Sequence, residues 1–125
     1  MTADDRKKLG QSGEKMAVKY LRKKGYRILE QNYRNRLGEI DIIARQRKTI
    51  VFVEVKTRRD TRFGDPKWSV TPKKQQRISM VALQYLKERD MNGLPARFDV
   101  VSIVHPHGGK GTIELVRNAF ELAYT

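Results

Sequence analysis

The sequence predicts a mixed α/β fold: a small five-stranded sheet, with one helix before it and a second helix inserted after its third strand. Two segments repeat apolar residues at helical spacing, and five others are short runs rich in β-branched residues. A length of 125 residues fits one domain, residues 1–125, large enough to bury a core. The chain has no cysteine, which excludes disulfides and thiolate zinc sites.

Both predicted helices carry an apolar stripe and a recognisable start. The first spans residues 12–24, with Ser12 as its capping residue and Gly25 just beyond its end. The second begins after Thr71, whose hydroxyl can cap it, and ends near Gly93. The stripes comprise Met16, Ala17, Tyr20 and Leu21 in the first helix and Ile78, Val81, Ala82, Tyr85 and Leu86 in the second.

The expected strands alternate with polar or glycine-rich connections. The run 108–111 is expected to be a hairpin loop between the last two strands, and the tail from Asn118 leaves room for a further short helix. The strands cover residues 26–33, 39–45, 49–57, 98–104 and 112–116.

The charge is strongly positive and unevenly distributed. The chain has 27 Lys and Arg against 14 Asp and Glu, and the whole excess of 13 lies in residues 1–77. This asymmetry favours a polyanionic partner, with nucleic acid ahead of an anionic membrane surface. A solvated basic face without a partner is the alternative. The polar start and the lack of a long apolar run predict a cytoplasmic protein without membrane association.

An acidic and basic group lies on the second and third strands. If they form a hairpin with a two-residue turn, paired residue numbers sum to 95. Asp41 then lies opposite Glu54, and Glu39 lies opposite Lys56, all on one face. A three-residue turn would instead place the two acids on different faces.

The remaining residues of this hairpin predict where its core lies. Near the turn both faces are apolar, so the acids enter at the margin of the buried layer. Paired acids there need either Lys56 or a divalent cation to neutralise them. With magnesium, such a group suits phosphodiester hydrolysis; an ordinary salt-bridged strand pair is the alternative. The opposite face is expected to be core and comprises Ile40, Ile42, Val51, Val53 and Val55.

The spacing of Asp41 and the run 54–56, Glu-Val-Lys, is similar to the Asp…Glu-x-Lys core of restriction-endonuclease-like nucleases. Further motifs over nearly the whole chain resemble the bacterial YraN-like family, whose nearest characterised relatives in pattern are archaeal Holliday-junction resolvases. Ile40 replaces the proline of the fuller nuclease motif, and the region after Arg58 departs from the resolvases. The matching motifs lie at residues 13–14, 17, 20–21, 25–26, 32–34, 38–43, 52–58, 74–75 and 97–101.

The resemblance implies a restriction-endonuclease-like fold and a metal site that uses Mg²⁺ or Mn²⁺. Asp41 and Glu54 would be metal ligands, joined by the backbone carbonyl of Val55. Lys56 would be the catalytic lysine. Two further site residues are implied, Glu14 as a direct or water-mediated ligand and Gln75 as a polar support.

Basic residues around this group are candidates for contacts with nucleic-acid phosphates. Lys and Arg at the start of the second helix oppose its dipole, which favours a ligand role for them. In the loop after the third strand, Phe63 and Trp68 either stack on bases or anchor the loop. The candidates are Arg34, Arg36, Arg58, Arg59, Arg62, Lys67, Lys73, Lys74 and Arg77.

These features predict a metal-dependent endonuclease acting on structured or branched DNA. The alternative is a non-catalytic nucleic-acid-binding module that retains the fold. Cutting branched DNA favours a homodimer, for which the neutral part, residues 78–125, offers a surface. Outside the site, Asp99 is predicted to be a buried, hydrogen-bonded acid, and residues 105–107, His-Pro-His, a solvated turn.

Overall fold

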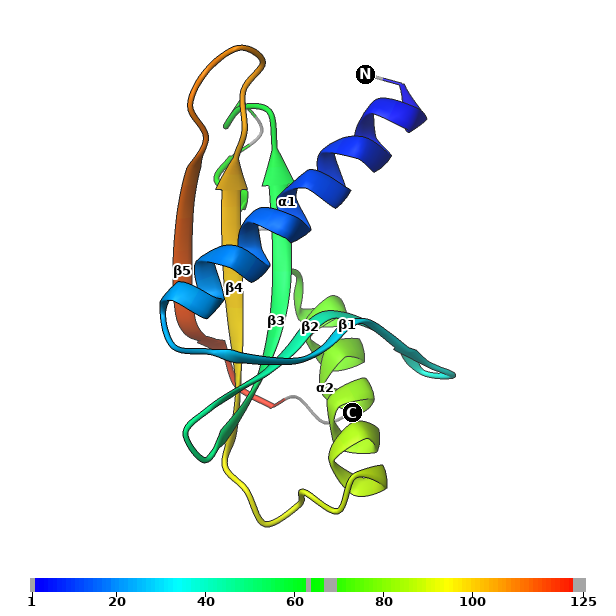
Figure 1. Cartoon of the computed structure of the whole chain (residues 1–125). Coiled ribbons are helices and arrows are strands. Elements are labelled where there is room, and N and C mark those ends of the chain that lie inside the picture. The colour runs from blue at the N-terminus through cyan, green and yellow to red at the C-terminus, as the bar shows by residue number, and fades with distance from the viewer. Residues whose placement is uncertain (1, 63, 67–69, 123–125) are drawn as a thin grey trace.

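A computed structural model describes residues 2–62, 64–66 and 70–122 of the protein and places them in a five-stranded sheet with two helices (Figure 1). The sheet order follows the chain; β3 and β4 are parallel and the other neighbours antiparallel. The predicted mixed α/β fold of a small restriction-endonuclease-like domain is confirmed. The elements are α1 (Ala3–Lys23), β1 (Arg27–Asn35), β2 (Gly38–Gln46), β3 (Thr49–Arg58), α2 (Pro72–Glu88), β4 (Ala96–Val104) and β5 (Thr112–Phe120).

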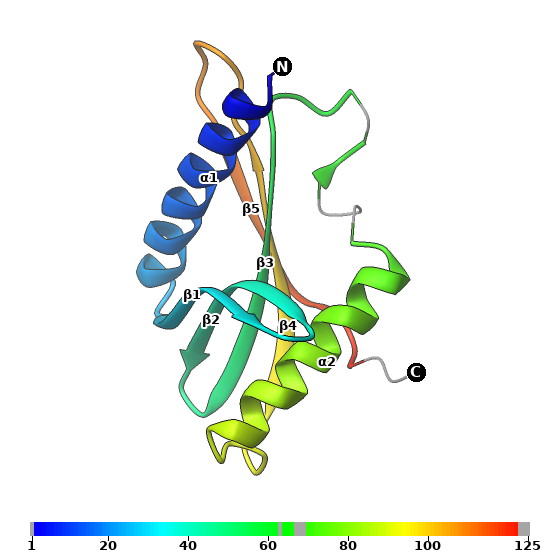
Figure 2. The same ribbon diagram turned by 90° about the vertical axis from the view of Figure 1, so that its right-hand side faces the viewer.

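The two helices cover opposite faces of the sheet, so each face has its own apolar cluster (Figure 2). α2 is the crossover that parallel strands require between β3 and β4. Neither helix of the described chain is long and apolar enough to cross a membrane. The α2 cluster includes Ile43, Ile50, Phe52, Val81 and Tyr85; the α1 cluster includes Ala17, Leu21, Ile42, Val51 and Val53.

α1 begins at Ala3 rather than at the expected Ser12, so the predicted start is wrong by more than two turns. The reason is a capping box: the Thr2 hydroxyl accepts the Asp5 N–H at 3.1 Å, and the Asp5 carboxylate accepts the Thr2 N–H at 3.2 Å. Acidic side chains in the first turn also favour this start. The predicted end is confirmed, with Gly25 at φ +89° beyond the last turn.

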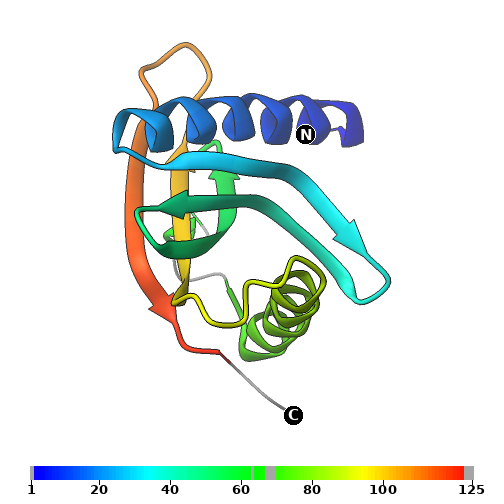
Figure 3. The ribbon, with the colours of Figure 1, turned by 60° about the horizontal axis from the view of Figure 1, so that its bottom comes forward.

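The predicted two-residue turn between β2 and β3 is confirmed, because their paired residues sum to 95. This pairing stops at Ile42 and Val53, so the expectation that Asp41 pairs opposite Glu54 is wrong. Beyond it, β2 stays paired with β1, and the β1–β2 hairpin curves away from β3 toward α2 (Figure 3). Because β2 bends away from β3, Ile40 packs in the α2 cluster. The expectation that Ile40 shares a face with Ile42 is therefore wrong.

The end of the described chain is a strand, and the short helix expected from Asn118 is absent from residues 118–122. Asn118 has φ +51° and lies where the pairing of β4 and β5 shifts by two residues. Its backbone N–H points out of the strand ladder and donates to a carboxylate oxygen of Asp99 at 3.0 Å. β5 therefore continues to Phe120 around a bulge.

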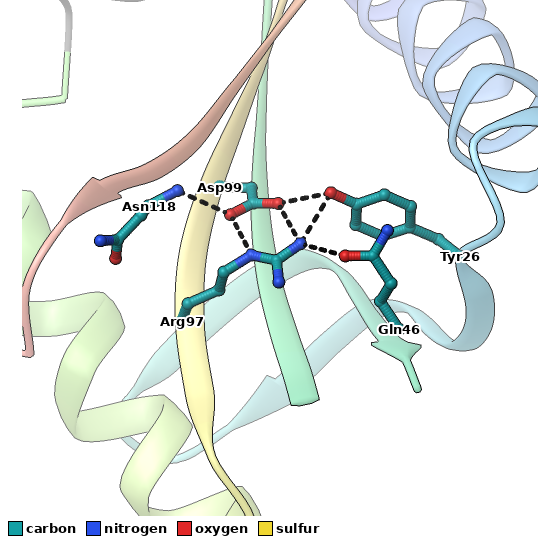
Figure 4. Close-up of polar contacts among 5 residues, drawn as sticks. All are labelled: Tyr26, Gln46, Arg97, Asp99 and Asn118. Carbon is teal, nitrogen blue, oxygen red and sulfur yellow. Dashed lines mark hydrogen bonds and ion pairs between the residues drawn. The ribbon is translucent and has the colours of Figure 1, made fainter. Parts of the chain in front are cut away.

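Asp99 is fully buried and hydrogen-bonded, as predicted (Figure 4). It accepts the Tyr26 hydroxyl at 2.9 Å and both Nε and Nη2 of Arg97, at 3.0 and 3.3 Å. Arg97 Nη2 also donates to Gln46 Oε1 at 2.7 Å. Tyr26 immediately precedes the edge strand β1, and Asn118 belongs to the edge strand β5. Their hydrogen bonds therefore link both edges of the sheet to Asp99.

Candidate functional site

Two adjoining clefts lie where β2 leaves β3. The hairpin cleft, of about 480 Å³, lies between the β1–β2 hairpin and the start of α2. The β3 cleft, of about 420 Å³, lies between α1 and the second half of β3. Both are lined by Glu39, Asp41, Glu54 and Lys74, which therefore lie where the clefts meet.

Asp41 reaches β3 through its side chain. Its Oδ2 accepts the backbone N–H of Val55 at 2.8 Å, just beyond the point where the β2–β3 pairing ends. Burial raises the pKa of Asp41 to about 7, with further raising by the negative charges of Glu54 and Glu14. This carboxylate therefore sits in a place that disfavours its own charge.

Glu54 is buried and holds two lysines. Its Oε1 lies 2.8 Å from Lys74 Nζ and 3.7 Å from Lys56 Nζ. Burial and the neighbouring Lys74 lower the pKa of Lys56 to about 8, although Glu54 opposes this shift. For Lys74, burial is the largest single influence and acts to lower the pKa. The hydrogen bonds to Glu54 and Lys56 and the negative charges of Glu54 and Asp41 together outweigh it, and the pKa is raised. Lys74 therefore stays charged and provides most of the compensation for Glu54.

Glu14 enters the β3 cleft because α1 crosses β3 very closely at the preceding residue. A Cβ atom on Gly13 would collide with the Thr57 hydroxyl, and it would lie 3.0 Å from Thr57 Cβ. Glycine is therefore required at the crossing, and Glu14 follows it into the cleft lining. The structure thus brings Asp41, Glu54, Val55, Lys56 and Glu14 into one cleft, as the sequence predicts.

Gln75 lies apart from this group. It lines neither cleft, and its side-chain amide donates to the backbone carbonyl of Val70 at 3.0 Å. That bond secures the chain before α2, the helix that carries Lys74. The supporting role of Gln75 stays a prediction.

Glu39 also differs from expectation. It was expected opposite Lys56, but β2 has already left β3 at this point. Glu39 is instead paired with Arg34 of β1, and its carboxylate accepts Arg34 Nη2 at 2.7 Å. The acid therefore holds a basic side chain at the rim of the hairpin cleft.

The acids suit magnesium better than a metal with a full set of protein ligands. Within the described ranges, no three His, Cys, Asp or Glu side chains gather closely enough to hold a metal by themselves. Asp41 and Glu54 offer two carboxylates beside a cleft that admits water. Mg²⁺ is commonly held by one or two carboxylates and keeps several waters, so these donors fit it. Lys74 now occupies the Glu54 oxygen that a cation would need.

Six of the nine predicted phosphate-contacting residues line the clefts. Arg62 and Lys73 line neither cleft, and Arg62 pairs instead with Asp60 at 3.4 Å. Lys67 lies outside the described residues, as do Phe63 and Trp68. The six are Arg34, Arg36 and Arg77 in the hairpin cleft, Arg58 and Arg59 in the β3 cleft, and Lys74 in both.

Sequence reasoning missed Arg6, which lines the β3 cleft from the first turns of α1. The signal was present, because Arg6, Gly10 and Glu14 follow one another at four-residue intervals and share a helix face. It was missed because the helix was expected to begin at Ser12.

Comparisons with known proteins identify the family. The model of a family described as "Uncharacterised protein family UPF0102" matches residues 13–103. A UPF0102 protein of Syntrophus aciditrophicus is 56% identical over 116 residues, covering 92% of this chain and 90% of that protein. One from Geotalea uraniireducens is 52% identical over 120 residues, covering 96% and 94%. The predicted YraN-like resemblance is confirmed, and the chain belongs to the uncharacterised protein family UPF0102.

Proposed function

We propose that the protein is a metal-dependent endonuclease that hydrolyses phosphodiester bonds in structured or branched DNA. One observation carries the proposal: Asp41, Glu54 and Lys56 line the β3 cleft together, and arginines line both this cleft and the adjoining hairpin cleft. Carboxylates, a lysine and phosphate-binding cations are the groups that metal-assisted phosphodiester hydrolysis needs. On this proposal the protein works in the cytoplasm, where bacterial DNA lies.

Asp41 and Glu54 would hold Mg²⁺ or Mn²⁺, with the carbonyl of Val55 and, directly or through water, Glu14. When bound, the cation supplies an activated water and offsets charge on the phosphoryl oxygens. The raised pKa of Asp41 supports this arrangement, because a neighbouring cation would offset the burial and the negative charges that raise it.

Lys56 would act on the reacting groups. Its ammonium lies 3.7 Å from Glu54 and its side chain is only 15% exposed, so its position is well defined. From there it can orient the attacking water and offset charge on the phosphate. Its lowered pKa, about 8, leaves a small neutral fraction at neutral pH that can accept a proton from water.

Cations on both sides of the acids would bind the DNA backbone. Arg34, Arg36 and Arg77 lie on the hairpin side, and Arg58 and Arg59 on the α1 side. A strand held at both sides continues past the acids in each direction, which favours cutting within a strand over trimming from its end. Two cuts in a branched substrate would call for a homodimer.

Incubation with labelled four-way, flapped, single-stranded and linear duplex DNA tests this function. Cutting is expected in Mg²⁺ or Mn²⁺, with four-way or flapped DNA preferred, and no cutting in EDTA. Lys56→Ala should abolish cutting while leaving DNA binding nearly unchanged. Lys73→Ala is the control, because Lys73 lines neither cleft. Full cutting by Lys56→Ala would contradict the assignment.

The short Lys74–Glu54 contact favours a second candidate, a nucleic-acid-binding module without catalysis. A lysine that permanently fills the cation position would leave the fold and the basic clefts intact. Binding that weakens steeply with salt, without cutting in either metal and without any effect of Asp41→Asn, would identify this function.

A further inference from the structure

A second basic pocket lies at the other end of β3, away from the clefts. It measures about 400 Å³ and is formed where the β2–β3 turn meets the start of β4 and the end of β5. No acid is among its described lining residues, and every lining side chain carries at least one hydrogen-bond donor. We call this the arginine pocket; it is lined by Gln46, Arg47, Thr49, Arg97 and Arg117.

Arg97 is held rigidly in this pocket by the buried network around Asp99. Its Nε and Nη2 both bond to Asp99, and Nη2 also bonds to Tyr26 and Gln46 (Figure 4). Its Nη1 forms no hydrogen bond with any described residue, and Figure 4 shows it directed away from this network. The side chain is 20% exposed, so one face of a fixed guanidinium remains available to a ligand.

Two further arginines flank Arg97. The guanidinium carbons of Arg97 and Arg117 lie 5.7 and 5.9 Å from the centre of the same ring, that of Tyr26. Arg47 stands at the tip of the β2–β3 turn with φ +56°. Three arginines therefore line one pocket. Arg97 is paired with the buried Asp99, and the described lining residues include no acid to balance the charges of Arg47 and Arg117.

We propose that the arginine pocket binds a phosphate group. Guanidinium groups match phosphate oxygens in charge and in bidentate geometry, and one of the three is already oriented. The site is separate from the clefts, because Thr49 and Lys56 are seven residues apart on β3, about 23 Å at about 3.3 Å per residue. The phosphate comes either from a free phosphate ester or from a nucleic-acid segment outside the clefts.

Thermal unfolding in millimolar inorganic phosphate, against chloride at equal ionic strength, tests the site. Phosphate should raise the melting temperature of the wild type by a few degrees. Arg47→Ala/Arg117→Ala should lose this rise, while Lys48→Ala, in the same turn but outside the pocket lining, should keep it. Arg97 is left intact because it holds the buried Asp99. An equal rise in the double variant would overturn the site.

A binding assay in EDTA separates the two phosphate sources and needs no cleavage, so its result is independent of the proposed nuclease activity. If the phosphate belongs to a nucleic-acid backbone, the double variant should bind fluorescent four-way DNA more weakly. Its slope of log affinity against log salt should fall by about 2. Unchanged DNA affinity of the double variant, with a phosphate-dependent rise that the wild type shows and the variant loses, would indicate a free phosphate ester. Unchanged DNA affinity with no such rise in the wild type would overturn the proposal.

Discussion

Asp41 and Asp99 lie on the two strands that flank β3, at nearly the same level along the sheet, but their surroundings differ. Asp99 is fully buried, with donors from Tyr26, Arg97 and the backbone of Asn118. Asp41 has one backbone donor and faces the negative charge of Glu54. Asp99 has its hydrogen bonds satisfied within the fold, whereas Asp41 is the acid for which we propose a cation as partner.

The contrast separates an acid that stabilises the fold from an acid that we propose for function. A satisfied buried acid joins strands and fixes their geometry. An acid beside another acid costs stability, and such sites cluster where chemistry is done. Only the second kind should respond to an added cation. The predictions that follow test this contrast in order of expected effect.

Asp99→Asn should be the most damaging change. It leaves the guanidinium of Arg97 partly buried without its counter-charge, which costs about 3–5 kcal/mol of unfolding free energy. Chemical denaturation followed by circular dichroism measures the loss. A cost below about 1 kcal/mol would show that the network around Asp99 is not a stabilising element.

Asp41→Asn, in contrast, should raise the unfolding free energy of the metal-free protein. The pKa of Asp41 is raised from 3.8 to about 7, so its contribution to stability is present below pH 4 and is lost as the pH rises through 7. Asparagine keeps an acceptor for the Val55 N–H and removes the charge. The variant should match the wild type at pH 4 and exceed its unfolding free energy by about 2–4 kcal/mol at pH 8. Equal stability at both pH values would contradict the assigned repulsion.

Gly13→Ala should perturb the crossing that brings Glu14 to the cleft. The added methyl group collides with Thr57, at a cost of about 1–3 kcal/mol. Gly10→Ala is the matched control one turn earlier, where a Cβ atom meets nothing within 4 Å and helix propensity gains up to about 1 kcal/mol. Thermal melts of the two variants should therefore shift in opposite directions, and shifts in the same direction would count against the tight crossing.

Lys74→Ala should have the smallest of these effects, which is a change in Mg²⁺ affinity. Lys74 competes with a cation for Glu54, so its removal should tighten Mg²⁺ binding several-fold, about 1 kcal/mol. Lys73→Ala, on the same turn of α2, should leave the affinity unchanged. Calorimetric titration distinguishes the two, and weaker binding by Lys74→Ala would assign that lysine a supporting role.

The sequence was sufficient to predict the structural features that depend on local residue patterns. The β2–β3 register, the apolar stripes and the grouping of Asp41, Glu54 and Lys56 follow from period-two and helical spacing. The buried Asp99 follows equally from an acid within an apolar strand.

The remaining features depend on contacts between distant segments. The departure of β2 from β3 accompanies packing of the hairpin on α2, where a Cβ atom on Gly38 would lie 3.2 Å from Val81. The ion pair of Lys74 with Glu54 joins residues twenty positions apart, and no spacing rule predicts it. From the sequence alone, the basic residues at the start of α2 indicate a ligand. The buried Glu54 explains one of them, because it pairs with Lys74.

Calorimetric titration of Mg²⁺ into wild type and Asp41→Asn at pH 8 tests the central contrast most directly. Saturable binding by the wild type, lost in Asp41→Asn and kept in Lys73→Ala, is the predicted result. Equal binding by wild type and Asp41→Asn, or none by the wild type, would show that Asp41 is not part of a cation site.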